Sequence, residues 1–205
     1  MKKKVALILV IFLSIGQLSV LISMIANAKK VVKEAEAENR IVYLECRPYD
    51  PYDPFKGRYI RLSFAIESVK ISDMETLKEV SSDIIKKHIF KEAYCLLEKK
   101  EKFHVIKDVL LSKPEEEVLF IKARINSFYS RDEDLGLSFS SNQYYLQEEL
   151  ALEADKMSNI EFQDLTPYVV IALDKNGNSV IKSMKVKDDV DIEDYLIEII
   201  NSKKQ

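Results

Sequence analysis

The longest uncharged run of this 205-residue chain lies at its amino end and constrains the fold most. It covers the 24 residues from Val5 to Ala28, with lysines on both sides. At about 1.5 Å per residue, a helix of this length crosses a hydrocarbon core of about 30 Å. A secretory signal has the same basic start, and Ala26-Asn27-Ala28 suits cleavage, but a signal core usually has only about 7–15 apolar residues. The run therefore favours an uncleaved membrane anchor, with a cleaved signal as the alternative.

Both alternatives place the rest of the chain outside the cytoplasm and divide the sequence into three parts. Residues 1–28 form the transmembrane anchor or signal segment, residues 29–40 a polar, helix-prone stalk, and residues 41–205 one extracytoplasmic, β-rich domain. Three of the 31 Lys and Arg lie in the first part, which leaves 28 against 34 Asp and Glu. This mixed, mildly acidic balance argues against nucleic acid as a partner. The expected location is the cell membrane, crossed once, with a periplasmic or cell-surface domain.

Prolines and aspartates are concentrated in the stretch Pro48–Phe64, which reads PYDPYDPFKGRYIRLSF. Proline fixes φ near −65° and biases the preceding residue toward extended conformations, so the first half predicts a rigid loop rich in turns. A glycine then stands where the chain must reverse. Beyond it, apolar and polar residues alternate. This alternation predicts a strand with Leu62 and Phe64 on its buried face and with Tyr59 and Arg61 on the other.

The same stretch resembles the GDYXXLXY proteins, which are named for the pattern Gly-Asp-Tyr-x-x-Leu-x-Tyr. The corresponding segment here is Gly57-Arg58-Tyr59-Ile60-Arg61-Leu62-Ser63-Phe64, in which Arg58 replaces the aspartate and Phe64 the final tyrosine. An upstream pattern of prolines and aspartates is matched at Pro48, Asp50, Pro51, Asp53 and Gly57.

Two weaker similarities to the family lie at residues 143–150 and around Asp174-Lys175-Asn176-Gly177. Over roughly residues 40–188, the resemblance implies a membrane-anchored architecture and no particular chemistry. Because Arg58 reverses the charge of the family's aspartate, no acid, base or metal role of that position carries over to this chain.

Alternating and periodic patterns in the remaining chain predict mostly strands. The expected strands are 41–44, 59–66, 93–99, 103–111, 118–125, 168–173 and 179–186, with turns at Lys100-Glu101 and Asn176-Gly177. The expected helices are one from Ser72, on a Ser-x-x-Glu capping box, one within 144–157 and one over 191–201, and residues 128–141 are expected to form an exposed loop. The fold class is therefore α+β and β-rich. One N-terminal transmembrane helix precedes a mostly antiparallel sheet or partly open barrel of about six or seven strands, flanked by two or three helices.

The cysteines and histidines do not have the spacing of a metal site. Cys46, His88, Cys95 and His104 are the right inventory for zinc but lack any short zinc motif. The segment Asp174–Asn178 begins like a calcium loop, but its glycine stands at the fourth position instead of the sixth. We therefore expect no metal and no other cofactor.

The cysteines and histidines also provide no catalytic nucleophile. A turn at Lys100-Glu101 would place Cys95 opposite Ile106, and Cys95 and His104 would be diagonal neighbours about 7–8 Å apart. A Cys–His pair needs direct hydrogen-bond reach to form a thiolate. No Gly-x-Ser-x-Gly, Ser-x-x-Lys or phosphate-binding glycine loop is present. We also expect Cys46 and Cys95 to form no essential disulfide, although the compartment permits one.

The aspartates of the proline-rich loop are the remaining candidates for chemistry. Paired acids can divide acid and base roles, but aspartates in such loops more often accept local backbone hydrogen bonds. We therefore expect no catalytic residue and predict a recognition surface. Its candidate residues are Asp50, Asp53, Arg58, Tyr59, Arg61, Tyr145 and Glu149, the last two on the resemblance alone. The structural positions of the motif are Pro48, Pro51, Gly57, Leu62 and Phe64.

These features predict a non-enzymatic accessory or interaction domain that its N-terminal helix tethers to the membrane. Its expected partner is a membrane or envelope protein, such as a polytopic membrane protein. The alternative is an extracytoplasmic hydrolase that uses carboxylates of the Pro48–Phe64 loop. A deep polar cleft containing Asp50 and another acid would favour the enzyme, whereas a flat, aromatic-rich surface would favour the accessory role.

Overall fold

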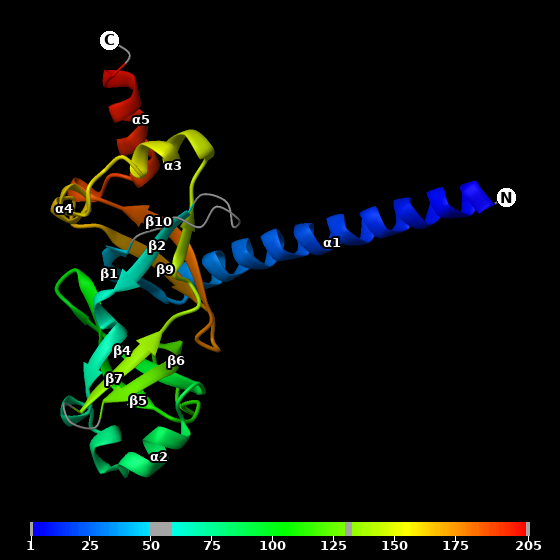
Figure 1. The fold of residues 1–205 in the computed structure, drawn as a ribbon. Helices are drawn as coiled ribbons and strands as arrows, with labels where there is room; N and C mark the ends of the chain where they lie inside the picture. Colours follow the sequence, from blue (N-terminus) through cyan, green and yellow to red (C-terminus); the bar gives the residue numbers. More distant parts are fainter. Residues whose placement is uncertain (1, 50–58, 130–132, 204–205) are drawn as a thin grey trace.

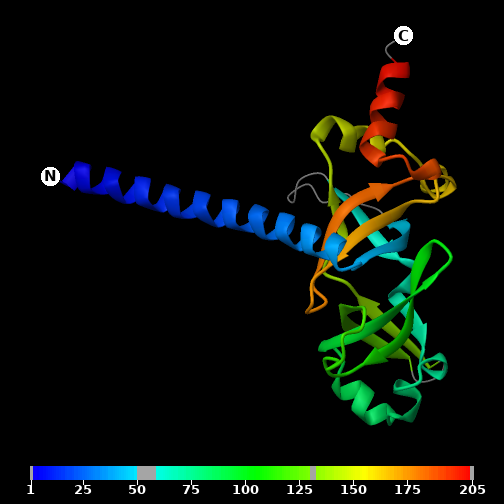
Figure 2. The same cartoon turned by 180° about the vertical axis from the view of Figure 1, so that it is seen from behind.

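The computed structural model describes residues 2–49, 59–129 and 133–203. A long helix, α1 (Lys2–Ala37), projects from a domain built on two five-stranded antiparallel sheets (Figure 1). Helices α3 (Glu148–Ala154), α4 (Asn159–Asp164) and α5 (Ile192–Ser202) lie at one end of the domain and α2 (Ser82–Lys87) at the other, as the view from behind also shows (Figure 2). The α+β, β-rich class is confirmed. The described residues form ten strands in two sheets, where about six or seven strands were expected.

The first sheet has the strand order β10–β9–β1–β2–β8, and the second has the order β3–β7–β6–β4–β5. The strands of the first sheet are β1 (Ile41–Tyr49), β2 (Tyr59–Phe64), β8 (Gln143–Tyr145), β9 (Tyr168–Leu173) and β10 (Ser179–Lys185). Those of the second are β3 (Ser68–Lys70), β4 (Glu92–Lys100), β5 (Phe103–Leu110), β6 (Phe120–Tyr129) and β7 (Asp134–Ser138). The two predicted hairpins, β4–β5 and β9–β10, are both present. Gly177 has a positive φ of 76° and is the last residue of the turn, in which its N–H donates to the carbonyl of Asp174 at 3.0 Å.

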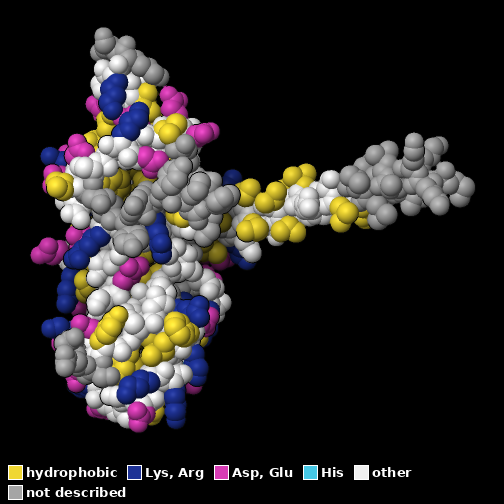
Figure 3. All heavy atoms as spheres, viewed as in Figure 1, with side chains coloured by type: hydrophobic (Ala, Val, Ile, Leu, Met, Phe, Trp, Pro, Cys, Tyr) yellow, Lys and Arg dark blue, Asp and Glu magenta, His cyan; other side chains and the backbone are white. Residues whose placement is uncertain are grey.

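Between Phe12 and Ala28, helix α1 has no charged residue and exposes apolar side chains to its surroundings. Phe12, Leu13, Leu18 and Met24 are each more than half exposed, and apolar side chains cover this part of the helix in Figure 3. The helix is long and apolar enough to cross a membrane. The segment predicted as a helical stalk continues α1 without interruption as far as Ala37.

The end of α1 is joined to the domain by a short, defined turn. The N–H of Arg40 donates to the carbonyl of Ala35 at 2.8 Å, and Asn39 has φ 55°. This is the pattern of a Schellman motif, in which asparagine is one of the few residues that adopt the left-handed conformation readily. Ala35 is 1% exposed, and the N–H of Leu173 on β9 donates to the carbonyl of Arg40 at 3.1 Å. The helix therefore leaves the domain in one fixed direction.

Two ion pairs reinforce this junction. The Lys182 ammonium on β10 lies 2.5 Å from the Glu36 carboxylate, and the Lys175 ammonium in the β9–β10 turn lies 2.9 Å from that of Glu38. The hydrogen bond from Lys175 is the main reason why the pKa of Glu38 lies below its ordinary value. Exposed pairs of this kind contribute little individually, but both hold the same hairpin against the end of α1.

Strand β1 connects the two sheets. Residues 41–45 of β1 pair with β9, and residues 46–49 pair with β2. Along its first half, β1 also lies against β5, where the N–H of Tyr43 donates to Nδ1 of His104 at 3.1 Å. A continuous cluster of buried apolar side chains extends through both sheets. Phe64 of β2 and Phe139, just after β7, meet edge to face across the boundary, with ring centroids 5.7 Å apart.

The helix predicted from Ser72 is wrong. The chain instead forms two 3₁₀ turns, Ile71–Asp73 and Leu77–Glu79, before the six-residue α2. Ile71, Met74 and Leu77 are all buried at a spacing of three, which matches the three residues per turn of a 3₁₀ helix. The buried Asp108 carboxylate accepts hydrogen bonds from the N–H and the hydroxyl of Thr76, at 3.2 and 2.6 Å, and holds the turns against β5.

The exposed loop predicted for residues 128–141 is also wrong. Strand β6 continues to Tyr129, and β7 occupies residues 134–138. Leu135, Leu137 and Phe139 alternate with more exposed residues and are each at most 3% exposed, so this segment is a half-buried strand. Helix α4 was not expected, although Ser158 and Glu161 form the reciprocal capping box at its start.

We expect Phe64→Ala to lower the free energy of unfolding by about 3–5 kcal/mol, because the change leaves a cavity where the two sheets meet. Ile84→Ala is the control, since Ile84 on α2 is 45% exposed and its truncation should cost about 1 kcal/mol or less. Urea unfolding of the full chain in detergent, followed by tyrosine fluorescence, measures both. Equal losses in the two variants would contradict the assignment of Phe64 to the core.

We expect the bond from Tyr43 to His104 to make stability depend on pH. Burial, and secondly the charge of Lys99, lower the pKa of His104 below its ordinary value, and Nδ1 cannot accept the Tyr43 N–H when protonated. The unfolded chain, with a histidine pKa of about 6.5, then binds more protons than the folded chain as the pH falls below that value. The folded state therefore loses stability between about pH 7 and 5. His104→Gln, which keeps an acceptor but cannot titrate, should lose less over the same range. Parallel pH profiles of unfolding would contradict this.

Candidate functional site

The described residues place three of the predicted recognition residues on adjacent strands of the first sheet. Tyr59 and Arg61 are on β2, and Tyr145 is on β8, which pairs with β2 and forms one edge of the sheet. Glu149 is exposed in the first turn of α3, after a two-residue connection from β8. The other predicted residues, Asp50, Asp53 and Arg58, lie outside the described residues, as do Pro51 and Gly57. Pro48 is on β1, directly opposite Leu62 of β2.

Tyr59 and Tyr145 form a cross-strand pair at the edge of the sheet. They are directly opposite in the register of β2 and β8, and their ring centroids are 5.7 Å apart at 49°. The alternation predicted Tyr59 on the face away from the core, yet Tyr59 is only 8% exposed, with the ring of Tyr145 against it. Tyr145 is 61% exposed, and its hydroxyl donates to Oε1 of Gln143 on the same strand at 2.8 Å. The pair thus presents one tyrosine ring to solvent and supports it with the other.

A comparison with protein families identifies the chain. The model of the GDYXXLXY protein family matches residues 17–184, which include this tyrosine pair, both sheets and most of α1. The chain belongs to the GDYXXLXY family. No curated protein and no solved structure matches it significantly.

Some side chains of the GDYXXLXY segment lie in the hydrophobic core, and others lie at the surface. Leu62 and Phe64 are each 2% exposed. Phe64 stands where the family pattern has its final tyrosine, and its ring, which has no hydroxyl, contacts Phe139 edge to face within the buried apolar cluster. Arg61, in contrast, is exposed and lies opposite Gln143 of the edge strand.

Sequence reasoning missed Tyr144, the neighbour of Tyr145 in the segment 143–150 that resembles the family. Its hydroxyl donates to Oε1 of Glu193 on α5 at 2.5 Å. Burial, and then this bond to a carboxylate, raise the pKa of Tyr144 well above its ordinary value. Alternation along β8 could have indicated that Tyr144 and Tyr145 face opposite ways. Only the structure shows that the inward tyrosine ties the edge strand to the C-terminal helix.

The cysteines are not placed for chemistry. Cys46 on β1 and Cys95 on β4 are buried free thiols in different sheets, and burial raises the pKa of Cys95 to about 12. The predicted neighbourhood of Cys95 and His104 is wrong, because Cys95 lies opposite Val109 and His104 opposite Lys99. A bulge between Leu96 and Leu97 and a turn one residue later than expected shift the register. Among the described residues, no three His, Cys, Asp or Glu cluster as metal ligands.

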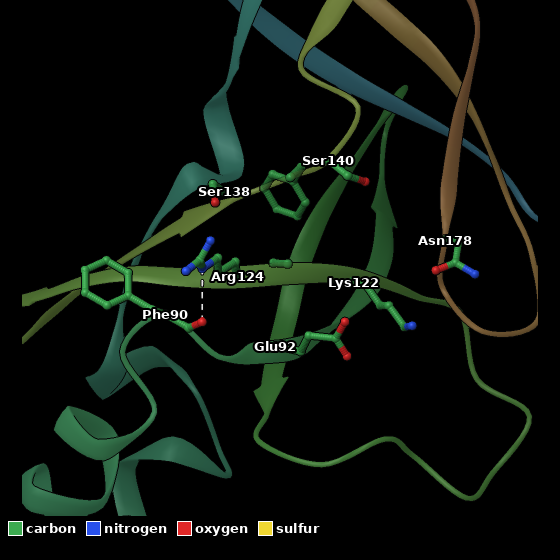
Figure 4. Close-up of a pocket in the computed structure, with 9 residues that line it drawn as sticks. Phe90, Glu92, Lys122, Arg124, Ser138, Ser140 and Asn178 are labelled. Atoms are coloured by element: carbon green, nitrogen blue, oxygen red, sulfur yellow. Dashed lines mark hydrogen bonds between the residues drawn. The ribbon is translucent and has the colours of Figure 1, made fainter.

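Two hollows that described residues line lie away from the tyrosine pair. One, of about 360 Å³, lies between α3, α4 and α5. It contains the buried Glu153 carboxylate, whose pKa is lowered by hydrogen bonds from Lys156 and then Lys203, so its charge is already paired within the fold. The other, of about 480 Å³, lies where the outward face of β6 meets the β9–β10 turn (Figure 4).

Proposed function

We propose that this GDYXXLXY protein is a membrane-tethered interaction domain. Helix α1 anchors it, the domain lies outside the cytoplasm, and its partner is a membrane or envelope protein of the polytopic kind. The observation that carries the proposal is the unbroken passage of α1 from an uncharged run of 24 residues into the domain. The proposal divides the chain into an anchor of residues 1–28, a helical stalk of residues 29–40 and a domain of residues 41–205.

The length of α1 sets the height of the domain above the membrane. The uncharged run ends at Ala28, and nine further helical residues lead to Ala37. They span about 13 Å at about 1.5 Å per residue. The polar headgroup region on each side of a bilayer is about 5–8 Å thick, so the domain is close to the lipid surface. The fixed turn at Asn39 adds a fixed direction, which is a geometry suited to a partner that the membrane also holds in place.

We propose that this partner binds the edge of the first sheet that carries Tyr59 and Tyr145, which we call the tyrosine edge. A large, exposed, stiff aromatic ring binds with little loss of side-chain entropy, and tyrosines are common among the residues that dominate interface energies. Tyr145 meets this description, because the ring of Tyr59 supports it and the strand that carries it is an edge. An edge strand also leaves backbone groups on its outer side available for pairing. Arg61 and Glu149 extend the proposed surface, together with Asp50, Asp53 and Arg58 of the connected loop.

We expect the full chain to remain with membranes after high-salt and alkaline carbonate washes, because about 20 apolar residues suffice to anchor a helix. Intact-mass measurement should show an uncleaved chain, and external protease should digest the domain in cells whose outer barriers are opened. A mature chain that starts at Lys29 would show a cleaved signal instead. A domain that resists external protease but is digested after lysis would contradict the extracytoplasmic placement.

We expect Tyr145→Ala to weaken binding of the membrane partner about tenfold, which corresponds to about 1.4 kcal/mol. The matched control is Tyr129→Ala, since Tyr129 on β6 is 62% exposed, nearly the same as Tyr145 at 61%, but lies in the other sheet. A photo-crosslinking residue placed at 145 should give a discrete adduct with one membrane protein, and the same residue at 129 should not. Both alanine variants should keep the stability of the parent chain within about 1 kcal/mol. Equal adducts at the two positions, or none at either, would reject the tyrosine edge as the contact.

A further inference from the structure

The larger hollow combines a strained aromatic residue with an oriented guanidinium. Arg124 and Lys122 project from the outward face of β6, Glu92 of β4 lies beside them, and Asn178 closes the side toward the β9–β10 hairpin (Figure 4). The N–H of Lys122 donates to the carbonyl of Gly177 at 2.9 Å, which fixes the hairpin on β6. The volume of the hollow, about 480 Å³, falls within the range of about 300–1,000 Å³ that small-ligand sites occupy.

Phe90 is held in a conformation that costs energy. Its φ is 67°, which is rare for an aromatic residue. Its N–H donates to the carbonyl of Ile125 at 2.7 Å, and its carbonyl accepts a hydrogen bond from Nε of Arg124 at 3.0 Å. Its ring is nevertheless 65% exposed, so burial of the ring does not explain the strain. Backbone strain that neighbouring bonds maintain is concentrated at ligand sites.

The strained loop orients Arg124. Nε of Arg124 is bonded to the Phe90 carbonyl, and the guanidinium lies 5.4 Å from the centroid of the Phe90 ring. The two terminal amino groups of the guanidinium remain, and this fork matches a carboxylate or a phosphate. Glu92 is directly opposite Arg124 in the β4–β6 register. Yet within the part of the chain that the structure describes, neither Arg124 nor Lys122 has an acidic side chain within ion-pair distance.

We propose that this hollow binds the oxyanion group, carboxylate or phosphate, of a small ligand. Arg124 is its bidentate donor, Lys122 supplies a second positive charge, and Phe90 orients Arg124 and covers one side of the ligand. Glu92 keeps the site at two positive charges against one negative, which suits a singly charged group. The site lies in the second sheet and at the hairpin, so it is separate from the tyrosine edge, and either proposal can fail without the other.

The test uses the isotope-labelled full chain in lipid nanodiscs, with the Nε–H signal of Arg124 observed by nuclear magnetic resonance. Inorganic phosphate and succinate are the soluble probes, and nanodiscs with phosphatidylglycerol are compared with nanodiscs of phosphatidylcholine alone. A saturable shift with phosphate or succinate identifies a soluble ligand. A shift that appears only with phosphatidylglycerol identifies a lipid headgroup. If all three probes leave the signal unchanged, the proposal is wrong.

Two variants and a control distinguish a built site from a charged surface. Arg124→Lys keeps the charge but removes the fork and should weaken binding about tenfold or more, as read from tyrosine and backbone signals. Glu92→Gln should tighten binding, because it removes the opposing charge. Lys107→Gln, at an exposed lysine on β5, should have no effect. Unchanged affinity in Arg124→Lys, or loss of affinity in Lys107→Gln equal to that in Arg124→Lys, would overturn the site.

The variant Phe90→Gly tests whether the strained Phe90 serves ligand binding or the stability of the fold. Glycine adopts positive φ at little cost, so this variant should melt at the same temperature as the parent chain or higher, while it weakens oxyanion binding. A lower melting temperature with unchanged binding would show that Phe90 serves the fold and not the site.

Discussion

The backbone of β1 is the element on which the remaining structure depends. Its first half pairs with β9, its second half pairs with β2, and the N–H of Tyr43 reaches His104 on β5. Because the Schellman turn at Asn39 leads directly from α1 into this strand, the helix cannot change direction without breaking backbone pairs in the first sheet. Each buried backbone group left unpaired costs about 1–3 kcal/mol, whereas exposed ion pairs such as that of Glu38 and Lys175 contribute little. Backbone pairing, more than surface charge, therefore holds the helix on the domain.

This attachment restricts how the domain can meet another molecule. A flexible tether lets a domain search a wide volume at a low effective concentration. With α1 anchored as proposed, a continuous helix with a fixed turn instead confines the domain to one height above the membrane and a narrow range of directions. Such confinement reduces the entropy that binding must overcome when the partner is held in the same membrane. Under the proposed function, it also excludes partners whose binding surfaces lie at another height above the membrane, and the length of α1 is then a determinant of specificity.

The elements that local signals specify could be predicted from the sequence, and those that distant contacts specify could not. Asn176-Gly177 predicted the β9–β10 hairpin, in which Gly177 has positive φ and the nearby Asp174 carboxylate accepts the N–H groups of Asn176 and Asn178 at 2.8 Å. The same Ser-x-x-Glu pattern starts a helix at Ser158 but not at Ser72. The difference is Asp108, which is far along the chain and binds both the N–H and the hydroxyl of Thr76. A local sequence motif gives no information about hydrogen bonds to a residue that is distant in the chain.

In the proposed sites, too, local sequence patterns predicted some features, and contacts between distant residues determine the others. The proline-rich stretch and the family pattern indicated β2 and Tyr145, but the burial of Tyr59 depends on the register between β2 and β8. Cys95 and His104 are also farther apart along the register than expected, because the β4–β5 turn lies one residue later and a bulge follows between Leu96 and Leu97. Phe90 carried no signal at all, since its positive φ results from bonds to Ile125 and Arg124 that only the folded sheet provides. Both proposed surfaces consist of side chains that the core does not require, Tyr145 at an edge and Arg124 on an outward face. The hydrophobic pattern, which reports burial, therefore specifies the fold of this protein far better than it specifies where the protein binds.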